Sequence, residues 1–276
     1  MPLLYLISCR MFEDELVHLF EEEERDAHLI LIENENTEGI ERKMGEVSVG
    51  YEKTSYEDLS SKLAATDDFV VVMDILEFAL DANPSLLKEK VYTAIEERGG
   101  LFDGILVFYG LCGNVLGSIE KDFSHLDIPV RILKDAHGNI MDDCICTAFG
   151  DRGAYVEAVM GQNRGEGTYF LTPMQAANWR EMLVLAKLTP DPDDTEMMKM
   201  VFDYSGYKKV GKVDTGLYYE KEFGNIVDEF ASLFSFEKCN FTGSTKIVDE
   251  CYRTIKKDII GNSISVSSID SEAIKD

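Results

Sequence analysis

The sequence predicts an α/β protein in which a mostly parallel sheet is flanked by helices in a Rossmann-like arrangement. Three observations lead to this fold class. Short continuous apolar runs recur along the chain, as in strands that are covered on both faces. Amphipathic helical stretches separate these runs, and turns containing glycine or proline lie between them. Strands that alternate with helices in this way favour a parallel sheet wrapped by helices.

The first half of the chain supplies five expected strands and four expected helices. Each strand is a short apolar run, and the helices show helical spacing of apolar residues or a start signal such as Asn83-Pro84. The expected strands are residues 3–8, 28–33, 69–73, 104–109 and 129–133, and the expected helices are residues 12–24, 55–65, 81–97 and 142–149. A polar stretch at 34–50 and a glycine-rich loop at 110–114 lie between them.

The pattern changes after residue 160. Strands are expected at 168–172 and 208–214, and helices at 174–188, 195–202, 226–234 and 247–258. We therefore expect an α/β domain over residues 1–160 that carries the cysteine motifs. A second α/β half, or a smaller lobe, should occupy residues 161–260 and pack on it. Residues 261–276 are rich in Ser and lack periodicity, so they are expected to form a disordered tail.

The composition argues against two classes of partner. The 276 residues include 52 acidic and 27 basic side chains, which gives a formal net charge of −25. A field of that sign repels phosphate backbones and anionic lipids, so neither nucleic acid nor a membrane is expected as a partner. The first residues lack the basic region of a signal peptide, and no apolar run approaches the ~18–20 residues that cross a membrane. We expect a cytoplasmic protein with reduced thiols.

Cysteines are the clearest carriers of chemistry in this sequence. Cys9, Cys112 and Cys144 each follow an expected strand. Ligands of open parallel sheets bind outside the carboxyl ends of the strands, so we expect these three thiols at one edge of one sheet. Helices are expected to start near Cys9 and Cys144, and a helix N-terminus stabilises a thiolate. Cys239 and Cys251 lie in amphipathic context and are expected to pack in the core.

Thiolates at such positions suit two kinds of chemistry. One is ligation of zinc or of an iron–sulfur cluster, and the other is nucleophilic or redox catalysis. The spacing contains no C-x-x-C and does not choose between them. A third interpretation is that the cysteines are small buried hydrophobes. His137, in the loop before Cys144, is the candidate catalytic base or additional ligand.

Residues at other strand ends are candidate cofactor-binding positions. Gly110 and Gly113 flank Cys112 in the run Tyr-Gly-Leu-Cys-Gly, and a backbone without Cβ atoms can approach a ligand closely. Thr172 ends a further expected strand, directly before Pro173. The run matches neither standard nucleotide-binding motif, so no nucleotide is inferred. The glycines could also serve only a sharp turn that positions Cys112.

At these residues the chain resembles the uncharacterised family catalogued as domain of unknown function sixteen thirty-eight, from methanogenic archaea and anaerobic bacteria. The matching pieces are Ser8-Cys9 with Glu15-Leu16, Tyr109-Gly-Leu-Cys-Gly113, Asp143-Cys-Ile145 with Gly150 and Tyr155, Gly167-Thr-Tyr-Phe-Leu-Thr-Pro173, and more weakly Val213-Asp-Thr-Gly216 with Gly243. The resemblance implies that Cys9, Cys112 and Cys144 belong to the family pattern. It also implies a setting, since members often accompany corrinoid-dependent methyl transfer from methylamines and related C1 compounds.

The chain departs from the family pattern at two positions. Asp81 stands where the family often has His before a Pro, so a carboxylate would replace an imidazole ligand. The family also tends to place His directly before Asp-Cys, whereas His137 is separated from Asp143 by an insertion. Both departures weaken a simple site of three cysteines and one histidine.

Three functional hypotheses follow. The first is a metal-binding accessory protein or enzyme, in which Cys9, Cys112 and Cys144 hold zinc or an iron–sulfur cluster and His137, Asp81, water or substrate fills a further position. The second is a metal-free enzyme with Cys112 as the catalytic nucleophile. The third is a small-molecule or corrinoid binding module with structural cysteines. The expected partner is a small-molecule substrate or a corrinoid or methyltransferase protein, and the sequence leaves open whether the chain forms a homo-oligomer.

Overall fold

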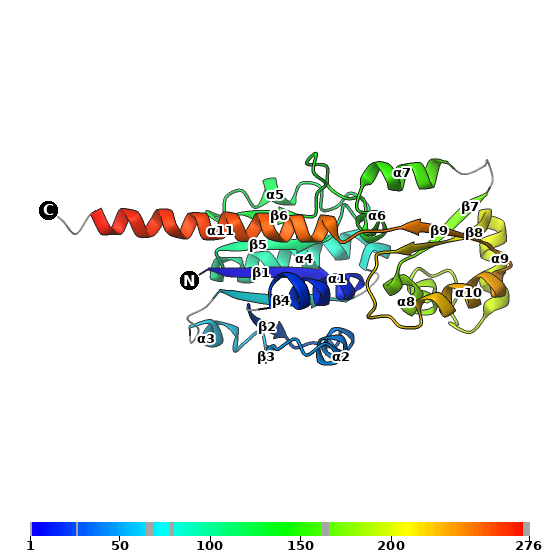
Figure 1. Cartoon of the computed structure of the whole chain (residues 1–276), viewed down its shortest axis with the longest axis horizontal. Coiled ribbons are helices and arrows are strands. Elements are labelled where there is room, and N and C mark those ends of the chain that lie inside the picture. The colour runs from blue at the N-terminus through cyan, green and yellow to red at the C-terminus, as the bar shows by residue number, and fades with distance from the viewer. Residues whose placement is uncertain (1, 26, 65–68, 78–79, 162–165, 273–276) are drawn as a thin grey trace.

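The structure is a computed structural model that describes residues 2–25, 27–64, 69–77, 80–161 and 166–272, with side chains as far as residue 261. It consists of two lobes that lie side by side along the long axis of the molecule, and the last helix runs back from the second lobe along the first (Figure 1). Within the described residues, every helix is too short or too polar to cross a membrane.

The first lobe is built on a parallel sheet of six strands in the order β3-β2-β4-β1-β5-β6. The strands are β1 (Leu3–Cys9), β2 (His28–Ile32), β3 (Glu52–Thr54), β4 (Val70–Leu76), β5 (Gly104–Phe108) and β6 (Val130–Ile132). The first strand lies at the centre, where Ile7 pairs with Asp74 of β4 on one side and with Val107 of β5 on the other. Both neighbours of β1 are therefore distant from it in sequence.

Helices cover both faces of this sheet because alternate residues of each strand point to opposite sides. Leu4 and Leu6 share one core with the helices α1 (Glu13–His18), α2 (Glu38–Glu46) and α11 (Lys246–Glu272). Tyr5 and Ile7 share the other core with α3 (Leu59–Leu63), α4 (Pro84–Arg98) and α5 (Ile119–Asp122). The helix after β1 and the helix after β4 thus lie on opposite faces, which makes the carboxyl end of β1 a topological switch point.

Short turns of helix complete the first lobe. They are the 3₁₀ helices η1 (Arg10–Phe12), η3 (Leu80–Ala82) and η4 (Gly99–Leu101), and the π-helix η2 (Leu19–Glu23). The first of these, η1, begins directly after β1, and η3 precedes α4. Both lie at the edge of the sheet where the carboxyl ends of the strands meet.

The second lobe has its own parallel sheet, in the order β7-β8-β9. Its elements are β7 (Gly167–Leu171), α8 (Pro173–Leu185), α9 (Thr195–Ser205), β8 (Tyr207–Asp214), α10 (Phe223–Phe234) and β9 (Glu237–Thr242). Trp179, Phe202 and Phe230 pack α8, α9 and α10 against one face of the sheet. The other face packs against α6 (Cys144–Phe149) and α7 (Arg152–Met160), which connect the two lobes.

A buried group of charges joins the lobes. The ammonium of Lys43 lies 3.0 Å from Glu13 and 2.7 Å from Asp14, both in the first lobe, and 2.7 Å from Glu220 of the second lobe. The Lys43 side chain is 1% exposed, so these contacts replace its hydration. The next acidic residue along α1, Glu15, is also buried, and one of its carboxylate oxygens has no hydrogen-bond partner among the described residues.

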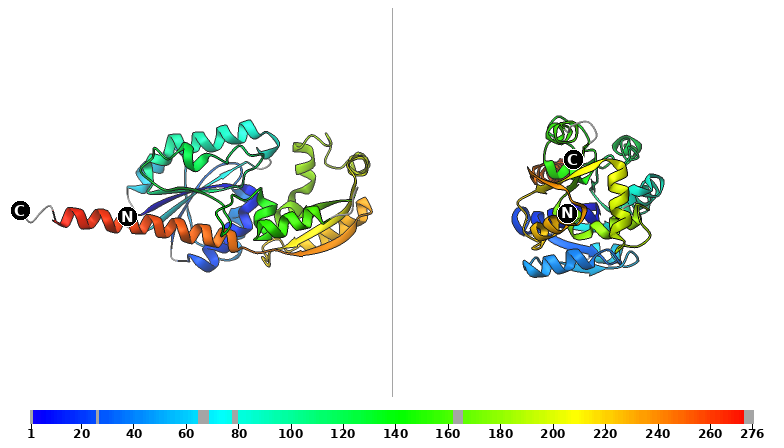
Figure 2. Two further views of the ribbon diagram at one scale, coloured as in Figure 1. Left: turned by 90° about the horizontal axis from the view of Figure 1, so that it is seen from above. Right: turned by 90° about the vertical axis from the view of Figure 1, so that its right-hand side faces the viewer.

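The predicted fold class is confirmed: both sheets are parallel and helices flank them (Figure 2). Five α-helices and strands of the described residues were not predicted, namely α2, α5, α7, β3 and β9. The strand β9 was missed because its Lys, Asn and Thr residues alternate with Cys239 and Phe241 at the edge of the second sheet, and so form no apolar run. The helix expected at 55–65 is shorter, as α3 over Leu59–Leu63, and Ala65 lies outside the described residues.

The last helix differs most from its expected length. A helix was expected over 247–258, but α11 continues to Glu272, through most of the segment expected to be a disordered tail. Residues 273–276 lie outside the described part of the chain. Ile247, Ile255 and Ile259 of α11 are buried against the first sheet, although they belong to the second half of the sequence. The first lobe is thus assembled from both ends of the chain.

Candidate functional site

Cys9, Cys112 and Cys144 gather where the structure places the topological switch point. Cys9 is the last residue of β1, Cys112 lies in the loop after β5, and Cys144 is the first residue of α6. Each of the three thiols is close enough to the others to act on them electrostatically: Cys9 raises the pKa of Cys112, and both raise the pKa of Cys144. Cys9 and Cys144 also pack on the same pair of methionines, Met11 and Met174.

Backbone hydrogen bonds bring two of the cysteine segments together. The N–H of Leu111 donates to the carbonyl of Met141 at 2.7 Å, and the N–H of Cys112 donates to the carbonyl of Asp142 at 3.0 Å. A Cβ atom on Gly110 would lie 2.5 Å from the Met141 carbonyl oxygen. Glycine is therefore required there for close contact between the two segments, rather than for contact with a ligand.

The loop that carries Cys112 has an unusual backbone. Cys112, Gly113 and Asn114 have φ angles of 43°, 77° and 65°, three successive residues in the left-handed region. This conformation costs a residue other than glycine roughly 1–2 kcal/mol of conformational free energy, so the surrounding contacts must hold the loop in place. One such contact is with the start of α4, because a Cβ atom on Gly113 would lie 3.2 Å from Pro84.

The surroundings of the thiols favour their neutral form. Burial is the main cause: it raises the pKa of Cys9 to about 12, and it also raises the pKa values of Cys112 and Cys144. The carboxylate of Asp81 acts in the same direction on all three, and Asp143 does so on Cys112 and Cys144. The Met11 N–H, 3.5 Å from the Cys9 Sγ, acts in the opposite direction on the pKa of Cys9, but it does not offset burial.

Tyr109 adds an unused hydrogen-bond donor to the site. Tyr109 is 2% exposed, and its hydroxyl meets no hydrogen-bond partner at normal geometry among the described residues. The hydroxyl lies beside the Cys9 thiol and lowers the pKa of that thiol. A buried hydroxyl without a partner is unfavourable by about 1–3 kcal/mol. A thiolate at Cys9 would give it an acceptor.

The second lobe reaches the site through the N-terminus of α8. Thr172 caps this helix in a capping box: its hydroxyl accepts from the Gln175 backbone N–H, and its own backbone N–H donates to the Gln175 side-chain oxygen. The Nε2 of Gln175 also donates to the Sγ of Cys144 at 3.0 Å. Thr172 therefore supports the site through Gln175, while its own hydroxyl is occupied by the cap.

The other two candidate ligands lie in different surroundings. Asp81 is exposed on η3, next to the start of α4, and its charge acts on all three thiols. His137 is exposed in the turn between Lys134 and Ile140, where its backbone N–H donates to the Asp135 carboxylate at 2.9 Å. Of the remaining cysteines, Cys146 is buried in the core of the first lobe, and the Cys251 thiol donates to the carbonyl of Lys134 at 3.4 Å.

The chemistry of the donor atoms suits a metal, whereas the present positions of the described side chains do not form a metal site. Three sulfur donors with a neighbouring carboxylate suit zinc or an iron–sulfur cluster by their chemistry. In the described part of the chain, however, no three Cys, His, Asp or Glu side chains converge closely enough to hold a metal ion as they stand. A metal would therefore require rotation of thiol side chains that already lie within electrostatic range of one another.

Comparison with known protein families identifies a matching family. Residues 75–252 match the family described as protein of unknown function (DUF1638). The chain belongs to this family. The resemblance seen in the sequence is thereby confirmed, and the matched range contains Cys112 and Cys144 but begins after Cys9. A comparison with curated proteins gives no match.

Sequence reasoning missed two side chains at the site of this DUF1638 protein. Gln175 occupies the third position of α8. The run Thr172-Pro-Met-Gln175 is itself a capping-box signature, which could have drawn attention to Gln175. Tyr109 belongs to the family motif, but its role depends on the hydroxyl lacking a partner, which only the packing reveals. Both supply donors next to sulfur atoms.

Proposed function

We propose that this DUF1638 protein is a metal-binding accessory protein or enzyme whose Cys9, Cys112 and Cys144 hold zinc or an iron–sulfur cluster. The observation that carries the proposal is the meeting of three thiols from three separate chain segments at the switch point of the sheet. Asp81, His137, water or substrate would complete the ligand set. Of the two side chains, Asp81 is the one whose charge acts on all three thiols.

The electrostatics of the site favour a bound cation over a free nucleophile. The carboxylates of Asp81 and Asp143 oppose an uncompensated thiolate, but they attract a metal cation, which would neutralise the thiolates. The Tyr109 hydroxyl and the Gln175 amide could then donate to sulfur atoms that carry negative charge. A free Cys112 nucleophile would instead need a base, and the candidate base His137 is exposed in a turn.

The chemistry of such a site depends on the group it holds. When bound, thiolate-ligated zinc could activate a substrate thiol, and a cluster with three cysteine ligands could bind substrate at its free iron. The residues of the chain would position the group between the two lobes and exclude water through Met11 and Met174. We propose a cytoplasmic role beside a corrinoid or methyltransferase protein in C1 metabolism, as the family resemblance implies.

Anaerobic purification followed by elemental analysis and a visible spectrum tests the proposal. We expect stoichiometric zinc or iron in the wild-type protein and its loss in Cys112→Ser. Cys239→Ser is the matched control because Cys239 lies on β9 in the second lobe, and this variant should retain the metal. A folded wild-type protein without metal would contradict the proposal. Fast alkylation of one thiol would then favour the hypothesis of a metal-free enzyme with a cysteine nucleophile. Ligand binding that survives replacement of each cysteine would favour the hypothesis of a small-molecule or corrinoid binding module.

A further inference from the structure

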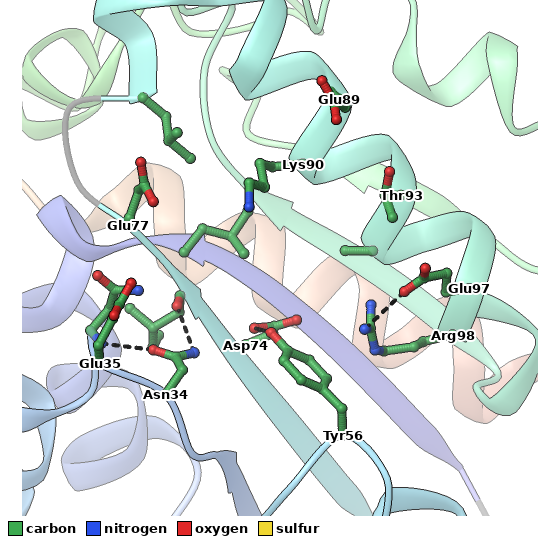
Figure 3. A pocket seen from close by; sticks show the side chains of 15 residues that line it. Asn34, Glu35, Tyr56, Asp74, Glu77, Glu89, Lys90, Thr93, Glu97 and Arg98 are labelled. Carbon is green, nitrogen blue, oxygen red and sulfur yellow. Dashed lines mark hydrogen bonds and ion pairs between the residues drawn. The ribbon is translucent and has the colours of Figure 1, made fainter.

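A separate pocket lies at the same edge of the first sheet, on the side of β4 that faces β2. It has a volume of about 460 Å³, within the range of roughly 300–1,000 Å³ that is typical of small-molecule sites. The loop after β2 and the end of β4 line it on one side, and α4 lines it on the other (Figure 3). None of the three clustered cysteines lines it.

The floor of the pocket is a buried carboxylate. Asp74 interrupts the otherwise apolar strand β4 and is 0% exposed. It accepts hydrogen bonds from the hydroxyls of Tyr5, at 2.5 Å, and Tyr56, at 2.8 Å. A buried carboxylate is unfavourable compared with an apolar residue of similar size, so the fold alone gives no reason for an acid at this position.

The walls of the pocket are held in place by contacts among themselves. The Arg98 guanidinium lies 4.0 Å from the centre of the Tyr56 ring and pairs with Glu97 at 2.9 Å. The side chain of Asn34 donates to the Ile75 carbonyl at 3.0 Å, which ties the loop after β2 to the end of β4. The pocket is therefore largely formed before any ligand enters.

Charges of both signs face the pocket without a partner. Lys90 extends from α4 toward the strand ends, and Glu77 and Glu35 lie across from it (Figure 3). In the ranges that the structure describes, none of these three side chains forms an ion pair or a side-chain hydrogen bond. An anion alone would face the carboxylates, and a simple amine would face Lys90. A molecule with one charge of each sign matches both walls.

We propose that this pocket binds a small zwitterion of the amino-acid class. Its carboxylate would contact the ammonium of Lys90, and its amine would contact Glu77 and Glu35. Asp74, Tyr56 and Arg98 would form a rigid polar surface beneath it. This site stands independently of the proposed metal site, because it shares none of the cysteines.

Calorimetric titration at neutral pH tests the proposal. The probes are the proteinogenic amino acids. Each is compared with two analogues, an amine that lacks the carboxylate and an acid that lacks the amino group. We expect at least one amino acid to bind at 1:1 stoichiometry, and its amine and acid analogues to bind at least tenfold more weakly. No binding by any amino acid, or equal binding of an analogue, would overturn the proposal.

Surface substitutions locate the binding without threatening the fold. Lys90→Gln and Glu77→Gln should each weaken binding at least tenfold, because both residues are exposed and face the pocket. Lys88→Gln is the matched control, since Lys88 lies on the same helix over the Tyr92 ring and outside the pocket. Cys112→Ser should bind as the wild type does. An equal loss in Lys88→Gln would place the ligand elsewhere and overturn the proposal.

Discussion

The side-chain amide of Gln175 donates a 3.0 Å hydrogen bond to the Sγ of Cys144, so a residue of the second lobe contacts a thiol of the first. The same side chain completes the capping box of α8 with Thr172. This hydrogen bond therefore couples the N-terminus of α8 to the Cys144 sulfur.

Gln175→Glu tests this coupling. The variant keeps the size of the side chain and a capping oxygen, but it replaces an amide donor with a carboxylate beside Cys144. Loss of a hydrogen bond to a charged sulfur, at about 1.5–3 kcal/mol, should weaken metal retention about tenfold or more in a competition with a chelator. Asn178→Asp, one turn further along α8, is the charge-matched control and should retain metal like the wild type.

Tyr109→Phe separates stability from metal binding. The Tyr109 hydroxyl is buried without a partner among the described residues, so its removal should leave the metal-free protein as stable as the wild type or up to about 1–3 kcal/mol more stable. The same change should make the loaded protein lose metal faster to a chelator. Denaturant unfolding and chelator competition measure the two effects. Equal metal retention in both proteins would show that the hydroxyl does not serve the thiolates.

Glu15 makes stability depend on pH. Burial raises the pKa of its carboxyl from 4.5 to about 8, and the neighbouring Asp14 adds to this shift. At pH values between 4.5 and about 8, the Glu15 carboxyl has lost its proton in the unfolded chain but keeps it in the folded protein. The free energy of unfolding therefore falls as the pH rises.

Glu15→Gln removes this dependence. The variant should be more stable than the wild type above pH 8, by up to a few kcal/mol at about 1.4 kcal/mol per pKa unit, and the two should converge near pH 4.5. Denaturant unfolding across this range measures the difference. Glu57→Gln, at an exposed position, should follow the wild-type profile. Parallel curves for Glu15→Gln and wild type would contradict the assignment.

Lys43→Met should destabilise the protein by about 3–5 kcal/mol, because it leaves the buried Glu13 and Asp14 and the half-buried Glu220 without their shared cation. Lys221→Met is the control: Lys221 pairs with Glu46 at 2.7 Å, but its side chain is 70% exposed, so its loss should change stability by about 0–1 kcal/mol. The melting temperatures of the two variants and the wild type, measured by thermal unfolding, test this difference. Similar melting temperatures would show that the buried charges do not hold the lobes together.

Five of the six strands in the first sheet were predictable because they lie in apolar runs, whereas β3, with the sequence Glu-Lys-Thr, was missed. Cys9, Cys112 and Cys144 could be assigned to one edge by the rule for parallel strands, without any knowledge of strand order. Contacts between distant segments could not be predicted, such as the Gly110 backbone against Met141. The sequence also placed the end of the third expected strand at Met73, directly before Asp74, and so missed the acid that forms the floor of the second pocket.

The return of α11 to the first sheet has a consequence for biosynthesis. Until the ribosome has released residues 246–261, one face of the sheet lacks Ile247, Tyr252 and Ile255 and exposes its apolar side chains. The amino-terminal lobe therefore cannot complete its folding before α11 has left the ribosome. Cleavage before α11 would accordingly release an aggregation-prone fragment that exposes this face of the sheet.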